Sequence, residues 1–134
     1  IFVTCSVFKY FKSLIVSNFV NPLKKRKLKQ ALALLLTINR IPQLYYGTEV
    51  LMNGSKKVTD GNVRRDFPGG FAGDKRNAFT KEGLTKEENA MFNWTSRLLH
   101  WRNGNDVITK GKQTQFIPYD GIYVIARTLG NKVV

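Results

Sequence analysis

Two segments of the chain repeat apolar residues with the period of an α-helix. Between residues 23 and 38 ("LKKRKLKQALALLLTI") apolar side chains recur every three or four positions, which predicts an amphipathic helix with a lysine-rich outer face. A second helix is predicted to begin after Thr85, because Glu88 completes a capping box, and to end at Gly104. The apolar stripe that we expect this second helix to bury consists of Met91, Trp94, Leu98 and Trp101.

The segment between the two helices changes character at residue 40. "RIPQLYYG" (residues 40–47) is short, apolar and aromatic, which is typical of a buried parallel strand. Residues 48–84 contain turn pairs and no periodic pattern, and an irregular region of this length is usually functional or disordered. Its apolar residues favour an ordered loop: Val50, Leu51, Met52, Phe67, Phe71 and Phe79.

Beyond Gly104 the pattern becomes that of a β segment. Short β-rich runs are separated by Asp120–Gly121 and by "LGN" (residues 129–131), and the Asp-Gly pair predicts a hairpin. We therefore place a domain boundary near residue 105, where a helix-and-strand region passes into an antiparallel β region.

Lysine and arginine outnumber acidic residues by 22 to 9, which gives a net charge of +13. Much of this excess lies in one run near residue 26, which could contact a polyanion or could form a solvated face. We favour the solvated face, because no nucleic-acid-binding motif accompanies the run. The run consists of Lys24, Lys25, Arg26, Lys27 and Lys29.

The N-terminal stretch is apolar but is interrupted by Lys9 and Lys12. No uninterrupted apolar run reaches the roughly 18 residues of a membrane-spanning helix, so we expect no membrane span. Residues 1–27 receive no assignment, and a disordered arm and a non-native stretch both stay open. The chain begins with Ile and ends in "LGNKVV", and we interpret it as a fragment.

The inventory of reactive side chains is small. One cysteine and one histidine, Cys5 and His100, exclude an internal disulfide and a Cys/His zinc site, and they offer no nucleophile–base set. We expect no cofactor and no metal. Carboxylates in the 48–84 region, together with arginines and aromatic rings, could hold a sugar, whereas turn-forming Asp and surface Arg are the alternative. These carboxylates are Glu49, Asp60, Asp66 and Asp74.

Three motifs in order resemble the α-amylase family of glycoside hydrolases. "IPQLYYGTE" (residues 41–49) is similar to the last barrel strand of that family, of the form I-P-x-x-Y-Y-G-x-E. "RRDFPGGF" (residues 64–71) and "GKQTQFIP" (residues 111–118) resemble the loop before the last barrel helix and the first strand of the following β-domain in the cyclomaltodextrinase and neopullulanase branch. The match covers about residues 28–134.

The resemblance implies an α/β fold, namely a C-terminal fragment of a (β/α)8 TIM barrel followed by the first strands of an antiparallel β-sandwich. Residues 28–104 would be the last helix–strand–helix part of the barrel, and residues 105–134 the start of the β-sandwich. The family cleaves α-glucosidic bonds in maltodextrins, cyclodextrins or pullulan with two carboxyl groups in a retaining mechanism.

The resemblance assigns no catalytic residue to this chain. The "NHD" motif, which the family places before its penultimate helix, is absent, so we expect the fragment alone to be inactive. The expected partner of the intact enzyme is an α-glucan oligosaccharide and not a nucleic acid, and a periplasmic or secreted location is compatible with the family. The rival hypothesis is a basic polyanion-binding module that uses the Lys/Arg run at 24–29.

Substrate contacts are carried over only where the motif matches. Asp60 and Arg64 have the spacing of an Asp/Arg pair that contacts, in related enzymes, a glucose one unit beyond the cleavage point. Arg65 and Asp66 could instead form a local ion pair that shapes the loop. The resemblance gives supporting roles in the loop to Glu49, Arg65, Asp66 and Phe71, and Phe71 stands where the branch more often has Trp.

Overall fold

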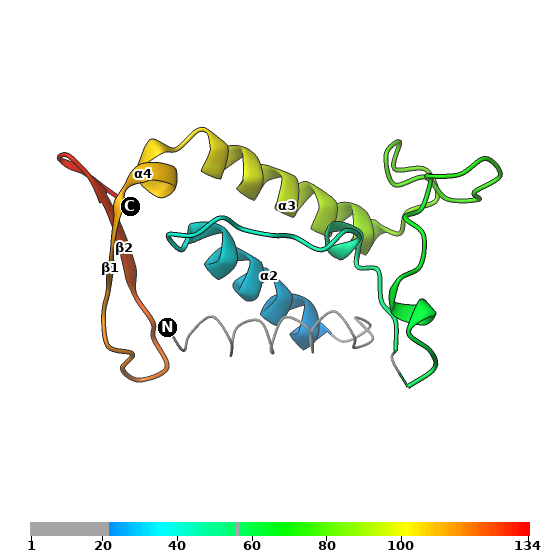
Figure 1. The fold of residues 1–134 in the computed structure, drawn as a ribbon, viewed down its shortest axis with the longest axis horizontal. Coiled ribbons are helices and arrows are strands. Elements are labelled where there is room, and N and C mark those ends of the chain that lie inside the picture. The colour runs from blue at the N-terminus through cyan, green and yellow to red at the C-terminus, as the bar shows by residue number, and fades with distance from the viewer. Residues whose placement is uncertain (1–21, 56) are drawn as a thin grey trace.

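The computed structural model describes residues 22–55 and 57–134, with side chains described from residue 25 onward. Figure 1 shows an elongated arrangement, with helices in the middle, a long loop at one end and a β-hairpin at the other. The larger elements are α2 (Pro22–Thr37), α3 (Lys86–Asn103), α4 (Asp106–Lys110), β1 (Lys112–Gln115), β2 (Ile125–Leu129) and β3 (Lys132–Val133). Two short 3-10 helices, η1 (Thr48–Val50) and η2 (Gly61–Val63), lie within the loop. No helix of this part of the chain is long and apolar enough to cross a membrane.

The two long helices form the main apolar contact. Leu28 and Leu32 of α2 are fully buried against Met91 of α3, and Trp94 and Leu44 pack at the edge of this cluster. The predicted helix at 23–38 is therefore confirmed to within a residue at each end. Of the segment 1–27, which received no assignment, residues 1–21 lie outside the described residues, and the remainder belongs to α2.

Helix α3 begins and ends as its sequence predicts. The Thr85 hydroxyl accepts a hydrogen bond from the Glu88 backbone N–H at 3.2 Å, and the Glu88 carboxylate accepts one from the Thr85 N–H at 2.7 Å. Gly104 is the C-terminal cap. The expected apolar stripe needs a correction at its end, because Trp101 is 42% exposed while Thr95 is buried.

The strand predicted at residues 40–47 is not present. Residues 41–45 have no regular secondary structure, and Ile41 is 96% exposed. A parallel strand requires a neighbouring strand to pair its backbone groups. Within the described residues this segment runs back beside α2 and α3 (Figure 1), and helices cannot provide that pairing.

The C-terminal region forms the predicted antiparallel sheet, in the order β1–β2–β3. In its register Lys112 lies opposite Thr128, and Thr128 lies opposite Val133. Asp120 and Gly121 both have positive φ angles, 49° and 72°, as a two-residue hairpin turn of type I′ requires, so the hairpin is confirmed.

The expectation of β structure directly after residue 105 was wrong for residues 106–110, which form α4. The Asn105 side chain accepts hydrogen bonds from the N–H groups of Val107 and Ile108, and this capping starts a helix in a sequence of weak helical preference. The change to β structure thus comes at Lys112.

Two arginines join these elements at the C-terminal ends of helices. Arg102 of α3 donates to the Leu36 carbonyl in the last turn of α2. Arg127 of β2 is 1% exposed and donates to the carbonyl oxygens of Ile108, at 2.8 Å, and Gly111, at 2.7 Å. Burial lowers the pKa of Arg127, and the positive charge of Arg102 lowers it further.

We expect Arg127→Met to lower the free energy of unfolding of the chain by about 1–3 kcal/mol for each carbonyl left without a donor. Urea unfolding followed by circular dichroism measures this loss, and Lys132→Met, at an exposed position of β3, is the matched control. A more stable Arg127→Met variant would mean that the cost of burying the guanidinium exceeds the value of its hydrogen bonds.

Candidate functional site

The long loop between Gly47 and Thr85 lies at the end of the molecule remote from the β-hairpin (Figure 1). Val50 and Ala78, each 1% exposed, are buried near its two ends and anchor the described residues around them. The predicted contribution of aromatic rings is seen in Phe67 and Phe79, whose ring centroids are 5.2 Å apart.

The first half of the loop folds back on itself. The Ser55 N–H donates to the Asn62 side chain at 2.7 Å, and the Tyr46 hydroxyl donates to the Arg65 carbonyl at 3.0 Å. Gly54 is required where the two arms meet, because a Cβ there would lie 2.2 Å from the Asn62 carbonyl oxygen. These contacts fix the backbone that carries the candidate substrate residues.

A hollow of about 270 Å³ lies between the folded-back arm and the start of α3. Four charged residues line it, two from the loop motif and two that the sequence did not single out for this site: Arg65, Asp66, Arg76 and Glu88. The hollow is slightly smaller than typical small-molecule pockets, and its charged lining suits a ligand rich in hydroxyl groups.

The predicted substrate pair brackets η2. Asp60 is the N-cap of this short helix and Arg64 is its C-cap, so the four-residue spacing places them at the two ends of one turn. Both residues are exposed, and neither lines the hollow. The structure therefore leaves both side chains exposed at the surface, and Arg64 directly precedes Arg65, which lines the hollow.

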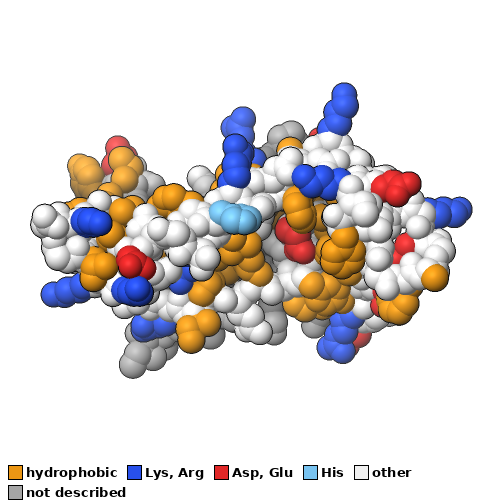
Figure 2. All heavy atoms as spheres, turned by 90° about the horizontal axis from the view of Figure 1, so that it is seen from above, with side chains coloured by type: hydrophobic (Ala, Val, Ile, Leu, Met, Phe, Trp, Pro, Cys, Tyr) orange, Lys and Arg blue, Asp and Glu red, His pale blue; other side chains and the backbone are white. Residues whose placement is uncertain are grey.

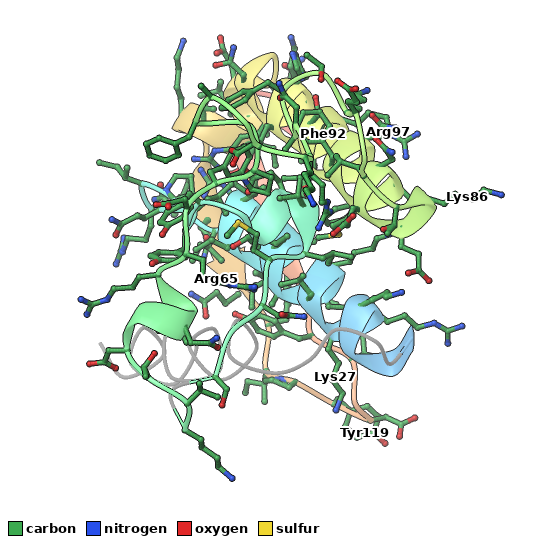
Figure 3. All side chains as sticks on the ribbon, turned by 90° about the vertical axis from the view of Figure 1, so that its right-hand side faces the viewer. Lys27, Arg65, Lys86, Phe92, Arg97 and Tyr119 are labelled. Carbon is green, nitrogen blue, oxygen red and sulfur yellow. The ribbon has the colours of Figure 1, made fainter. Side chains whose placement is uncertain are left out.

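The Arg65–Asp66 ion pair considered from the sequence is not formed within the described residues. Arg65 instead donates to the Asn53 backbone carbonyl, and Figure 3 shows its side chain lying along the loop backbone. Both residues line the hollow, so each contributes a charged group to its wall.

The other two predicted support residues lie apart from the hollow. Glu49 lies in the single turn of η1 and does not line it. Phe71 is 65% exposed and also does not line it.

Arg76 and Glu88 form the polar contact that sequence reasoning missed. Their side chains are 2.5 Å apart, and Arg76 also donates to the Gly83 carbonyl at 3.0 Å. Glu88 carries a sequence signal as a capping residue, but no local pattern connects it to Arg76, twelve positions earlier. The pair ties the end of the loop to the first turn of α3.

Two pKa shifts mark the site. Side-chain hydrogen bonding with Tyr45 is the main cause that raises the pKa of Tyr46, the charge of Asp66 raises it further, and Arg64 opposes the rise. Burial raises the pKa of Glu88, but hydrogen bonds from Thr85 and Arg76 outweigh that effect, and the net pKa is lowered from 4.5.

The basic run lies on α2, away from the loop. Lys25 pairs with Glu87 at 2.8 Å, and the Lys29 ammonium lies 5.5 Å from the centre of the Trp94 ring. Lys27 projects outward from α2 in Figure 3, and the Lys24 side chain lies outside the described residues. Figure 2, which views the molecule from the α3 side, shows Lys and Arg side chains spread over that face without forming one patch.

Comparison with known proteins finds an amylase and glucanotransferases among the relatives of the chain. No family model matches the chain. The chain is 32% identical over 108 residues to an alpha-amylase of Niallia circulans, which covers 81% of this chain and 17% of the relative. It is 31% identical over 123 residues to a cyclomaltodextrin glucanotransferase of Niallia circulans, and 30% identical over 123 residues to the same enzyme of Bacillus licheniformis.

The two glucanotransferase alignments cover 92% of this chain and 14% of each relative. The chain thus spans about a sixth or a seventh of the length of the relatives that it matches. These similarities support a relation to the α-amylase family, at low identity.

We expect Glu88→Gln to weaken the first turn of α3 and its tie to the loop at neutral pH. Because the pKa of folded Glu88 is lowered, its ionised form stabilises the fold above its ordinary value of 4.5, and this contribution is lost as the pH falls through the folded-state pKa. Amide hydrogen exchange in α3 should therefore differ between the variant and the unmodified chain at pH 7, and converge below the folded-state pKa.

Glu87→Gln is the matched control for this experiment, since Glu87 is also in the first turn but its side chain is 68% exposed. An equal effect of the two substitutions at pH 7 would contradict the special role of Glu88.

Proposed function

We propose that this chain forms the end of the catalytic barrel and the start of the C-terminal β-domain of a glycoside hydrolase in the cyclomaltodextrinase and neopullulanase branch. Residues 28–104 would complete the barrel, and residues 105–134 would begin the β-sandwich. The order of helix, extended segment, long loop, helix and antiparallel sheet supports this assignment, together with the relation to amylases and glucanotransferases.

The extended segment 41–45 fits the proposed place of a barrel strand. It is not helical, and its Ile41 side chain is almost fully exposed. In a closed barrel, strands on both sides would pair with this segment and cover its side chains. Loops that follow the strands at that face of a barrel build the active site, which is where the 48–84 loop would then lie.

The observation that carries the proposed function is the loop itself. Its backbone is held by internal hydrogen bonds, and it presents a charged hollow and, outside that hollow, the exposed side chains of Asp60 and Arg64. A carboxylate accepts hydrogen bonds from sugar hydroxyls, and a guanidinium donates to hydroxyl and ring oxygens. We therefore assign the loop to the wall of a glucan-binding cleft, on the side of the sugar that is transferred.

The chemistry of this proposal requires groups from elsewhere in a longer protein. Retaining cleavage uses a nucleophilic carboxylate and a carboxylic acid about 5–5.5 Å apart across the scissile bond. The role left to this chain is to bind and orient the glucan, which lowers the barrier through positioning. Hydrolysis and transglycosylation differ in the molecule that accepts the sugar, which is water in one and a second sugar in the other. A loop that binds the sugar to be transferred would therefore serve either reaction.

The rival proposal, a polyanion-binding module on α2, has weaker support. Of the run at 24–29, Lys25 is paired with Glu87, and Lys29 lies over the Trp94 ring. Binding of nucleic acid whose affinity falls steeply with salt, and which Arg26→Ala with Lys27→Ala abolishes, would favour this rival.

We expect the 134-residue chain alone to release no reducing sugar from maltodextrin, cyclodextrin or pullulan, because the proposal places both reacting carboxyl groups outside it. The measurement is a reducing-sugar assay on the purified chain. Turnover that disappears with Glu49→Gln or Asp66→Asn would contradict the proposal, since it would place a reacting carboxyl group within this loop.

In a longer enzyme that contains this chain, we expect Arg64→Ala to raise KM for maltodextrins. Loss of one charged hydrogen bond to a sugar costs roughly 1.5–3 kcal/mol of binding. Steady-state kinetics on maltodextrins measures the change, and Lys57→Ala, another exposed cation of the same loop, is the control. An unchanged kcat/KM in Arg64→Ala would remove this residue from the site.

A further inference from the structure

The tip of the long loop, residues 67–78, is tightly hydrogen-bonded although it projects from the molecule (Figure 1). One oxygen of the Asp74 carboxylate accepts the N–H of Gly69 at 2.8 Å and the N–H of Phe71 at 3.2 Å. The Asp74 N–H donates back to the Phe71 carbonyl at 3.3 Å, and the Ala78 N–H closes the loop on the Pro68 carbonyl at 3.0 Å. The backbone around Phe71 is therefore held in one conformation.

Glycines make this conformation possible and leave the tip open. Gly69 has a φ angle of 92°, and a Cβ at this position would lie 2.4 Å from the Asn77 side-chain oxygen. Gly73 has a φ angle of 90°, and a Cβ there would meet nothing within 4 Å. Small residues thus surround Phe71 on both sides along the chain.

Phe71 is the one ring of the tip that this scaffold presents to solvent without an aromatic partner among the described residues. Phe79 is similarly exposed, but it packs against Phe67. Burying a phenyl ring is favourable, so a ring that a hydrogen-bonded loop holds in water gains free energy when it meets an apolar face of a ligand.

We propose that Phe71 is a stacking platform for a glucose ring of an α-glucan and that Asp74 is the residue that positions it. This inference rests on the proposed function, which supplies the class of ligand. A glucose ring has an apolar face of C–H bonds that fits flat on an aromatic ring, and its hydroxyls lie at the edge. Lys75 follows Phe71 in the same loop and is exposed, so its ammonium offers a donor for those hydroxyls.

The geometry favours a sugar over a protein partner. A protein interface requires a contiguous apolar patch, whereas the residues that flank Phe71 are Gly70 and Ala72. One ring with small neighbours and charged groups beyond them matches the size of a single sugar unit. The contact adds affinity and orientation and takes no part in bond cleavage.

The test is binding of maltotriose and of β-cyclodextrin to the 134-residue chain, measured by saturation-transfer NMR and by titration of aromatic resonances. We expect Phe71→Ala to weaken binding about twofold to tenfold, the value of one aromatic contact. Phe71→Trp should bind as tightly as the unmodified chain or more tightly, because its ring is larger. Tyr119→Ala is the control, since Tyr119 is 85% exposed on the remote hairpin.

Asp74 is tested by a pair of substitutions. Asp74→Ala should weaken binding, whereas Asp74→Asn should restore it, because one amide oxygen can accept the same two N–H groups. Failure of Asp74→Asn to restore binding would show that the charge acts directly, and would overturn the positioning role.

The outcomes separate this inference from the proposed function. If the unmodified chain binds neither sugar, the glucan-binding role of the loop fails, and the platform fails with it. If the chain binds and Arg64→Ala weakens binding while Phe71→Ala does not, the proposed function stands and the platform is wrong. Equal losses in Phe71→Ala and Tyr119→Ala would indicate non-specific apolar contact and would also overturn it.

Discussion

The arrangement of the helices depends on which side chains donate hydrogen bonds to the carbonyl groups at their C-terminal ends. The last carbonyls of a helix have no intrahelical N–H, and they carry the negative end of the helix dipole. Arg102 supplies a donor to the end of α2, and Arg127 supplies one to the end of α4. Because each arginine belongs to another element, both caps also fix the packing of elements that are far apart in sequence.

A glutamine connects the Arg127 cap to the chain that follows α2. The Gln113 side-chain oxygen on β1 accepts the Asn39 N–H at 2.6 Å and a guanidinium N–H of Arg127 at 3.4 Å. The sheet is thereby held to the helices through polar groups, while Phe116, Ile117 and Tyr119 of the hairpin remain exposed. The small core between α2 and α3 needs this polar support, because none of the described hairpin residues belongs to it.

Local signals predicted local structure well and long-range contacts poorly. Thr85 with Glu88, and Asp120 with Gly121, each specify a backbone geometry within four residues, and both predictions were confirmed. The hydrogen bond from Arg102 to Leu36 joins residues 66 positions apart, and no periodicity or propensity in the sequence predicts a contact over such a separation. Trp101 was expected in the core from its spacing alone, but exposure depends on which elements are present to cover it.

The same limit applies to the site. The sequence motif contributes Arg65 and Asp66 to the lining of the hollow, yet the charges that meet there also include Arg76 and Glu88, which lie on either side of a turn and join only when the loop closes on α3. The assignment of Asp60 and Arg64 rests on spacing, and the structure shows what that spacing means physically: the two residues cap one turn.

Two kinds of exposed apolar residue can be distinguished by their backbone. No backbone hydrogen bond is formed by the N–H groups of Ile41, Gln43 and Leu44 within the described chain, so this segment has both unpaired polar groups and an exposed Ile41. Such a segment gains from pairing with another strand, which satisfies the backbone and covers the side chain together. Phe71 has the opposite character, because its N–H and carbonyl are already bonded and only the ring is free. A second strand would gain nothing there, whereas a small ligand that needs only a ring face would. The state of the backbone thus separates a surface suited to further polypeptide from one suited to a small ligand.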